Sequence, residues 1–258
     1  MADDPLARSL ELAAQAWGSR RTWFLSNGSS QGNLVCGLAV AGLGGSLVAQ
    51  RSVHSSVVDA LAMSGLEATF VTPDIDSRLG ILHTLTPQAL DEALTASPDA
   101  AAAIVVTPSY FGACADVEAL VAVAHSHDVA LVVDEAWGAH LGFHPDLPTN
   151  AARLGADLVV SSMHKLGGSL GQTALIHLGH GPYADRLEPL VDRAMRSMRS
   201  TSESTLLLAS LDLARRQLRQ RQRPKLRQDA PQPEPRVLAI AGEIFDLGIP
   251  ILLQPART

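Results

Sequence analysis

The sequence predicts an α/β fold, in which a mostly parallel central sheet is wrapped by helices. Short apolar runs alternate with amphipathic stretches along most of the chain, and several of the runs are continuous and β-branched. Continuous β-branched runs are typical of strands buried on both faces, and alternation with helices is typical of parallel strands. Apolar residues make up 47% of the 258 residues and charged residues 18%, so the chain can bury a sizeable core.

Seven strands are expected, each a short run of mainly apolar residues. The expected strands are Trp23–Ser26, Ser46–Gln50, Ala68–Thr72, Ala102–Thr107, Ala130–Asp134, Asp157–Ser161 and Thr173–Leu178. In sheets of this kind, binding sites form beyond the carboxyl ends of the strands. The polar residues that follow these runs are therefore the first candidates for function.

Six helices are expected between and after these strands. They are Gln31–Ala41, Ser55–Met63, Pro87–Ala96, Val117–His127, Pro182–Met198 and a last helix from Glu203 to about Gln220. We expect one major domain over residues 1–214. Residues 215–236 are rich in Arg, Gln and Pro and are expected to be a solvated helix end running into a basic linker, followed by a short apolar tail over 237–258.

Composition argues against several classes of function. The net charge of −6 disfavours general binding to nucleic acid, and the basic segment 215–236 has no aromatic residue to stack on bases. No apolar run is long enough to span a membrane, and Asp3 and Asp4 stand where a signal peptide would carry positive charge. Cys36 and Cys114 fit neither a disulfide framework nor a zinc site, so we expect both to be buried apolar fillers in a cytoplasmic protein.

Lysine usage singles out one residue. Of the 20 basic residues only Lys165 and Lys225 are lysines, and Lys225 lies in the polar arginine-rich stretch, where we expect it to be solvated. Lys165 follows an apolar strand, in a turn that also holds Ser162 and His164. Burial lowers the pKa of an amine, and an uncharged amine is what a Schiff-base lysine requires. A lone loop lysine is more often a surface residue, so this interpretation depends on its neighbours.

An acidic residue, Asp134, ends a buried strand upstream of Lys165. A protected carboxylate suits the pyridine nitrogen of pyridoxal 5'-phosphate (PLP), which must keep its proton if the ring is to accept electrons. His54 follows the second strand and could stack on a flat cofactor ring. Helix capping or metal binding by Asp134, and a structural role for His54, remain open alternatives.

A Gly/Ser-rich turn lies between the first expected strand and the first expected helix. Its sequence, from Asn27 to Asn33, places the hydroxyls of Ser29 and Ser30 beside a helix N-terminus. Free N–H groups and the positive end of the helix dipole favour a phosphate there. Taken alone the signal is weak, because serine and asparagine also cap helices that bind no ligand.

Together these segments resemble the major domain of the Orn/Lys/Arg decarboxylases, which has the aspartate-aminotransferase-like fold of fold-type-I PLP enzymes. The resemblance covers roughly Leu10 to Arg215. It rests on Gly28-Ser29-Ser30, His54, Thr107–Gly112, Asp134-Glu135-Ala136, Ser162-x-His164-Lys165 with Gln172, and Ser200-Thr201-Ser202 followed by Leu206–Asp212.

The resemblance implies a role for each matched residue. Lys165 would form the Schiff base with PLP, Asp134 would pair with the pyridine nitrogen, and His54 and Ala136 would contact the two ring faces. The residues that would hold the phosphate are Ser29, Ser30, Ser162 and His164. Thr201 would reach the phosphate of a neighbouring subunit, because family sites are shared across a homodimer. The implied reaction is decarboxylation of an amino acid, of the ornithine, lysine or arginine class.

The chain also departs from the family pattern. Ser55 stands where relatives usually have lysine, Met163 where they often have threonine, and Trp137 where many have histidine. The sequence starts after the family's N-terminal segment, and its last forty or so residues do not resemble the family's C-terminal domain. A shortened relative that binds PLP or dimerises without catalysis is therefore the principal alternative, and other fold-type-I activities also remain open.

Two further enzyme classes compete for the same residues. Gly28-Ser29-Ser30-Gln31-Gly32 fits a hydrolase nucleophile motif, with Asp134 and His140 in the right order, although only about one helix precedes it. His140 and His144 have helical spacing for a metal, but Gly142 and Pro145 should break a helix there, so we expect no metal site. The remaining histidines expected at the surface or in loops are His125, His127, His177 and His180.

Overall fold

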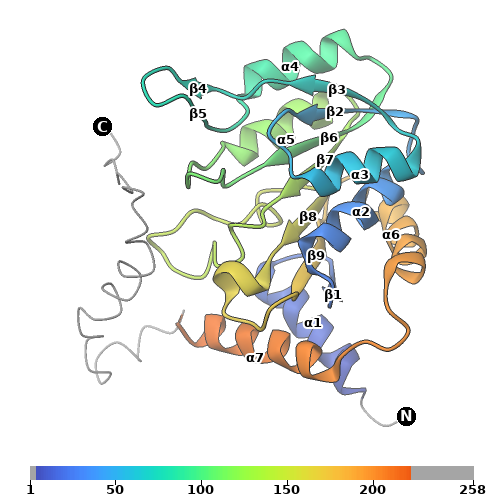
Figure 1. Ribbon diagram of the computed structural model, residues 1–258, viewed down its shortest axis with the longest axis vertical. Helices are drawn as coiled ribbons and strands as arrows, with labels where there is room; N and C mark the ends of the chain where they lie inside the picture. The colour runs from blue at the N-terminus through green and yellow to red at the C-terminus, as the bar shows by residue number, and fades with distance from the viewer. Residues whose placement is uncertain (1–3, 222–258) are drawn as a thin grey trace. The chain divides into compact units, whose positions relative to one another are not determined.

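The computed structural model describes residues 4–221, and its central feature is a seven-stranded sheet (Figure 1). The strands are β1 (Arg21–Leu25), β2 (Ser46–Gln50), β3 (Glu67–Val71), β6 (Ala100–Val106), β7 (Ala130–Asp134), β8 (Leu158–Ser161) and β9 (Ala174–Leu178). Their order across the sheet is β1-β9-β8-β7-β6-β2-β3. Only β9 runs against the other strands, since it is antiparallel to both β1 and β8. The predicted fold class, an α/β fold with a mostly parallel sheet, is confirmed.

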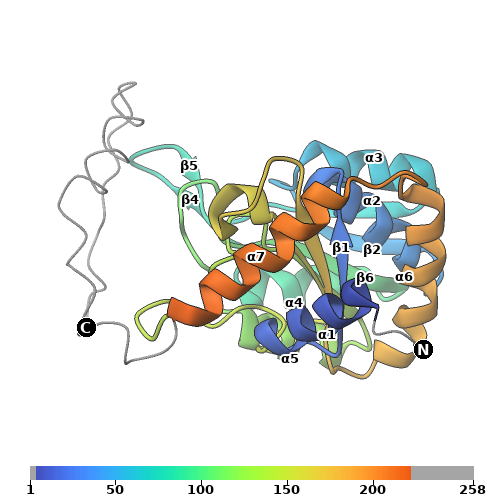
Figure 2. The ribbon, with the colours of Figure 1, turned by 90° about the horizontal axis from the view of Figure 1, so that it is seen from below.

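Helices connect the strands and cover both faces of the sheet. They are α1 (Pro5–Trp17), α2 (Gly28–Val40), α3 (Ser55–Ser64), α4 (Pro87–Ala96), α5 (Val117–Ser126), α6 (Ala184–Met198) and α7 (Thr205–Arg221), with a π-helical turn, η1 (Met163–Gly167), after β8. A two-stranded hairpin of β4 (Ile75–Asp76) and β5 (Ile81–Leu82) lies outside the main sheet. In Figure 2, α2, α3 and α6 lie on one side of the sheet and α1, α4 and α5 on the other.

Alternation along each strand divides the core between these two layers. On β6, Ala102 and Ile104 face the α2 and α6 layer, whereas Ala103 and Val105 pack among residues of α4 and α5. A third cluster joins Trp17 of α1 to residues of β9 and α7. Because the sheet is buried on both faces, its middle strands need apolar side chains at every position.

Several helix ends follow from local sequence. Asp4 accepts a hydrogen bond from the Leu6 N–H at the start of α1, and Gly18 ends that helix with a φ of 72°. Thr86 and Asp116 cap α4 and α5 in the same way, through the N–H groups of Ala89 and Ala119. These caps fix the residues at which the helices begin and end.

Every predicted element is observed with the expected type, and most bounds differ by a few residues; α1, η1 and the hairpin of β4 and β5 were not among the predicted elements. The expected strands Ser46–Gln50 and Ala130–Asp134 and the helix Pro87–Ala96 have the predicted bounds, while α2 begins three residues before the expected Gln31. Helix α7 extends to Arg221, through the first part of the expected linker. The rest of the linker, the tail and Lys225 lie outside the described residues. The domain boundary at residue 214 stays a prediction.

Two expectations about burial were wrong. Cys114 is exposed, because it lies in the loop after β6 rather than in a packed element; Cys36 is buried in α2 as expected. His177 is fully buried, because it lies within β9, where both faces of the sheet are covered. Its Nδ1 shares a 2.9 Å hydrogen bond with Thr22 Oγ1, and burial lowers its pKa to about 3, which keeps the ring uncharged.

Within residues 4–221, no helix is long and apolar enough to cross a membrane.

Candidate active site

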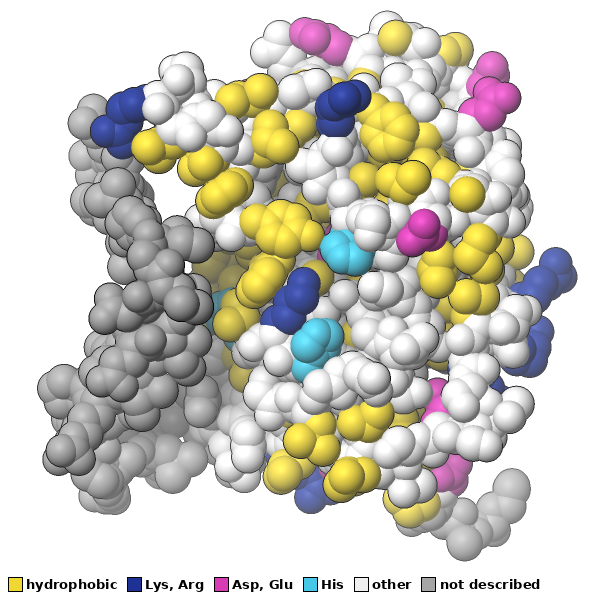
Figure 3. Space-filling view, viewed as in Figure 1, with side chains coloured by type: hydrophobic (Ala, Val, Ile, Leu, Met, Phe, Trp, Pro, Cys, Tyr) yellow, Lys and Arg dark blue, Asp and Glu magenta, His cyan; other side chains and the backbone are white. Residues whose placement is uncertain are grey.

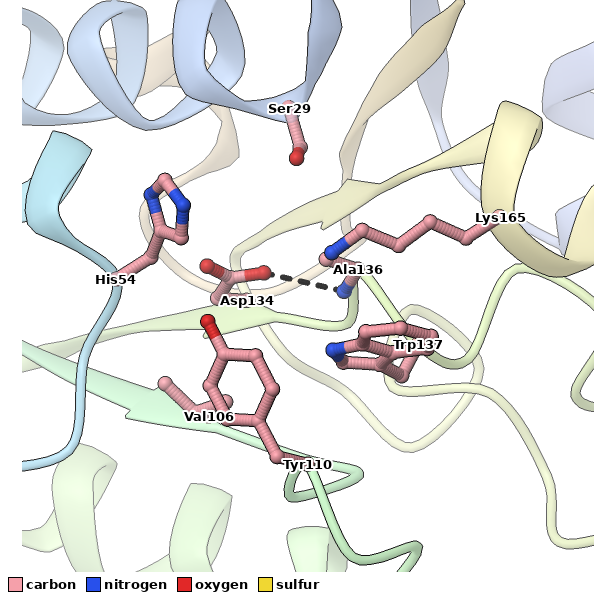
Figure 4. Close-up of a pocket in the computed structure, with 8 residues that line it drawn as sticks. All are labelled: Ser29, His54, Val106, Tyr110, Asp134, Ala136, Trp137 and Lys165. Carbon is pink, nitrogen blue, oxygen red and sulfur yellow. Dashed lines mark hydrogen bonds between the residues drawn. The ribbon is translucent and has the colours of Figure 1, made fainter. Parts of the chain in front are cut away.

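A pocket lies at the carboxyl edge of the sheet, where five strands end. Its volume is about 280 Å³, including the open mouth. The lining residues are Ser29, His54, Val106, Tyr110, Asp134, Ala136, Trp137 and Lys165 (Figure 4). They follow or end β1, β2, β6, β7 and β8, so chain segments far apart in sequence converge on one site. This is the position at which ligands bind in open α/β sheets.

Asp134 forms a buried acidic wall of the pocket. It is the last residue of β7, is 3% exposed, and lies beside Val106 of β6 in the strand register. One carboxylate oxygen accepts the Ala136 N–H at 3.1 Å, and the other accepts the Asn33 amide at 2.9 Å. Burial raises the pKa of Asp134, while these two donors and the nearby Lys165 and His54 oppose that rise.

A chain of hydrogen bonds connects Asp134 to His54. The Asn33 amide nitrogen also donates to Ser56 Oγ at 3.0 Å. His54 Nδ1 accepts the Ser56 N–H at 3.2 Å and lies 2.9 Å from Ser56 Oγ. Because Ser56 Oγ accepts from Asn33, its own proton is available to His54 Nδ1, which leaves Nε2 as the protonated ring nitrogen. The imidazole is thereby held at the edge of the pocket.

Lys165 approaches Asp134 from the opposite side. It lies in η1, just after β8, and its Nζ lies 4.3 Å from the centre of the Trp137 ring. Burial lowers the pKa of the amine, and the charge of Asp134 opposes this shift. The Lys165 side chain therefore enters a partly desolvated pocket from a tight turn, whereas the side chain of a surface loop lysine is solvated.

Helix α2 brings an uncapped N-terminus to the same edge. The preceding residue, Asn27, makes no side-chain capping bond. Gly28 adopts a φ of 75°, and its N–H donates to the Gln172 carbonyl at 2.6 Å. At Gly32 a Cβ atom would lie 2.6 Å from Val160 Cγ1, so this glycine allows α2 to pack close to β8.

The hydroxyls expected to bind a phosphate are only partly assembled. Ser162 Oγ donates to Ser29 Oγ at 2.8 Å, which joins the end of β8 to α2. Ser30 is exposed and does not line the pocket. His164 Nδ1 donates to the Thr173 carbonyl at 2.9 Å and also lies outside the lining. Thr201 is exposed in the connection between α6 and α7.

The sequence alone missed several members of the site. Asn33 and Ser56 connect Asp134 to His54, yet nothing in their sequence positions marks them except that Asn33 lies one turn after Ser29 on α2. Tyr110 belongs to a segment quoted for the family resemblance, but without a role. Trp137 differs from the histidine that many relatives have, a difference that does not predict its place in the pocket wall or its contact with Lys165.

No contact among the described residues supports the hydrolase triad or the metal site. Asp134 is hydrogen-bonded to Asn33 and Ala136, and His140 Nδ1 is buried without a hydrogen-bond partner, so no bond connects Ser30, Asp134 and His140 as a hydrolase triad. Among residues 4–221, no group of three or more His, Cys, Asp or Glu side chains is placed to hold a metal ion.

Comparison with known protein families assigns the chain to one of them. The family described as Orn/Lys/Arg decarboxylase, major domain, matches residues 3–232. The chain belongs to this family. An arginine decarboxylase of Bacillus subtilis (strain 168) is 41% identical over 214 residues, which are 83% of this chain and 43% of that protein. A lysine decarboxylase of Pseudomonas aeruginosa is 27% identical over 81% of this chain and 30% of that protein.

Solved structures share the fold. Lysine decarboxylase A from Pseudomonas aeruginosa superposes on this chain with a TM-score of 0.74 and 23% identity. The match covers 94% of this chain and 33% of the lysine decarboxylase chain. A serine palmitoyltransferase from Sphingomonas wittichii gives a TM-score of 0.64 over 84% of this chain and 51% of its own, at 20% identity. The chain spans less than half the length of the curated relatives that it matches.

Proposed function

We propose that this domain binds PLP through Lys165 and takes part in decarboxylation of a basic amino acid. The observation that carries the proposal is the convergence of Lys165 and Asp134 on one pocket beside an uncapped helix N-terminus. The 41% identity to an arginine decarboxylase supports the reaction class.

The residues of the pocket fit this cofactor. Asp134 offers a buried carboxylate to a ring N–H, and each of its oxygens has one donor among the described residues, which leaves lone pairs for a ligand. The N–H groups at the start of α2, with Ser29 and Ser162, offer donors to a phosphate. Lys165 supplies an amine whose pKa is lowered by burial, as carbonyl chemistry requires.

Each pocket residue would have a separate role in the reaction. When bound, PLP would supply an electron sink for the electron pair left when the substrate loses carbon dioxide. Asp134 would keep the proton on the pyridine nitrogen, and His54, held through Ser56, would orient the ring. Lys165 Nζ, inside the pocket, could move a proton to or from the substrate.

A homodimer is part of the proposal. Large apolar side chains are exposed on the loop after β6 and on the turn that carries Lys165: they are Tyr110, Phe111, Leu166 and Leu170. Figure 3 shows hydrophobic side chains near a basic side chain and histidines on the face that it draws. A second copy could cover this surface and bring Thr201 to its neighbour's phosphate site. The cytoplasmic location stays a prediction.

The first experiment measures cofactor binding. The protein would be purified with added PLP, freed of excess cofactor, and its visible absorption spectrum recorded. We expect a band that Lys165→Ala lacks and Lys225→Ala keeps, and borohydride reduction should fix the cofactor mass on the peptide containing Lys165. A folded wild-type protein with no such band would contradict the proposal.

A second candidate is a domain that binds PLP without turnover. The arginine decarboxylase of Bacillus subtilis matches this chain over only 43% of its own length, so its name alone does not assign turnover to this domain. Assays of carbon dioxide release from arginine, lysine and ornithine distinguish the two, because a PLP band without release supports the non-catalytic function.

A further inference from the structure

Trp137 forms one wall of the pocket, and its ring faces the amine of Lys165. The residue follows Asp134 by three positions in the loop after β7. Lys165 Nζ lies 4.3 Å from the centre of the indole, within the range at which a cation is attracted to an aromatic face. In Figure 4 the lysine side chain extends over the indole toward Asp134.

Neighbouring groups hold the indole in this orientation. Tyr110 packs edge-on against it, with ring centres 6.0 Å apart and an interplanar angle of 65°. The Asp134 carboxylate accepts the Ala136 N–H, and the Gly138 N–H donates to the Glu135 carbonyl at 2.8 Å, which fixes the backbone on both sides of Trp137. The ring face is therefore in place before any ligand arrives.

Packing alone does not explain a tryptophan here. The indole Nε1 is buried and has no hydrogen-bond partner among the described residues. A buried N–H without a partner is unfavourable, and an apolar side chain such as phenylalanine would carry no such group. Among aromatic rings, indole attracts a cation most strongly, so the identity of this residue matches its contact with Lys165.

We propose that Trp137 is a positioning residue for Lys165. Its ring face binds the charged amine of Lys165 and holds it inside the pocket until the amine reacts with the cofactor. The consequence for cofactor loading rests on the proposed function, whereas the contact itself does not. Burial opposes the charged amine, and Asp134 and the indole face both favour it. The other titratable groups lining the pocket are His54 and Tyr110.

The test uses the cofactor-free protein and its scarcity of lysine. Reductive methylation with ¹³C-formaldehyde labels Lys165, Lys225 and the N-terminal amine, and Lys165→Arg identifies the first signal. In wild type we expect an upfield ring-current shift for Lys165 that Trp137→Leu abolishes. The pKa of the labelled Lys165 should fall by about half to one unit in Trp137→Leu and by less in Trp137→Phe, with Lys225 unchanged.

Each outcome decides the proposal. A Lys165 signal without a ring-current shift in wild type would overturn it even if Trp137→Leu failed to fold. An unchanged or higher Lys165 pKa in a folded Trp137→Leu protein would overturn it as well, since water entering the pocket would then matter more than the ring.

A second measurement concerns loading. The rate at which PLP produces the visible band should have a pH midpoint about half to one unit lower in Trp137→Leu than in wild type. An unshifted midpoint would overturn the role in loading. If no band forms in wild type, the proposed function fails, while the labelling experiment still decides whether Trp137 binds the amine.

Discussion

At the scale of single residues, the site depends on an asparagine that does no chemistry itself. Asn33 donates to Asp134 at 2.9 Å and to Ser56 at 3.0 Å, and Ser56 in turn contacts His54. Asn33 is buried, so the carboxylate and the imidazole are held by one amide on α2. Burial raises the pKa of Asp134, and the hydrogen bond from Asn33 opposes this rise.

Replacing Asn33 should therefore weaken both stability and the site. In Asn33→Ala one oxygen of buried Asp134 loses its donor, and we expect the free energy of unfolding to fall by about 1–3 kcal/mol in urea titrations. PLP should also bind more weakly. Asn27→Ala is the matched control, because Asn27 is exposed and makes no capping bond. If Asn27→Ala lowered the free energy of unfolding as much as Asn33→Ala, this explanation would be refuted.

At the scale of elements, strand ends were predictable and side-chain networks were not. Asp134 and Lys165 stand out because continuous apolar runs stop just before or at them, and the ends of parallel strands meet at one edge. The start of α2 was missed by three residues, because Gly28 and two serines look like turn residues although they form the first helical turn. Asn33 reaches Asp134 through the packing of α2, and Tyr110 reaches the pocket through the loop after β6, and no local sequence pattern encodes either contact.

The loop after β7 carries a second buried acid, which should make stability depend on pH. Glu135 is 1% exposed, and one of its oxygens accepts the Ala151 N–H at 2.8 Å. Burial raises its pKa from 4.5 to about 8. Between these values the folded chain holds a proton that the unfolded chain has lost, so stability falls as pH rises.

Glu135→Gln should remove this dependence, because glutamine does not titrate and can still accept from Ala151. We expect the variant to gain stability relative to wild type as pH rises from 5 to 8, by up to about 1.4 kcal/mol per pH unit, measured as urea midpoints and slopes. Glu118→Gln, which removes an exposed carboxylate on α5, is the control for the change in net charge. Parallel pH curves for wild type and Glu135→Gln would show that Glu135 is charged throughout.

At the scale of the whole molecule, the fold places its pocket beside several of its exposed apolar side chains. The lining residues come from five strand ends, so the pocket exists once the sheet has formed. Phe111 is 60% exposed and Leu170 45% exposed, each close in sequence to a residue that lines the pocket. A surface of this kind beside a binding site is typical of a protein interface.

Self-association through this surface is the last prediction. Light scattering coupled to size exclusion should give a dimer for wild type and a monomer for Phe111→Glu combined with Leu170→Glu, because an unpaired charge buried in an apolar interface is strongly unfavourable. Leu213→Glu, at an equally exposed leucine on α7, is the control and should stay dimeric. A wild-type protein that remains monomeric at high concentration would contradict the shared site, and a control that also dissociates would move the interface to α7. If the double variant is folded and monomeric, its PLP band should weaken, because Thr201 of the second copy would no longer reach the phosphate site.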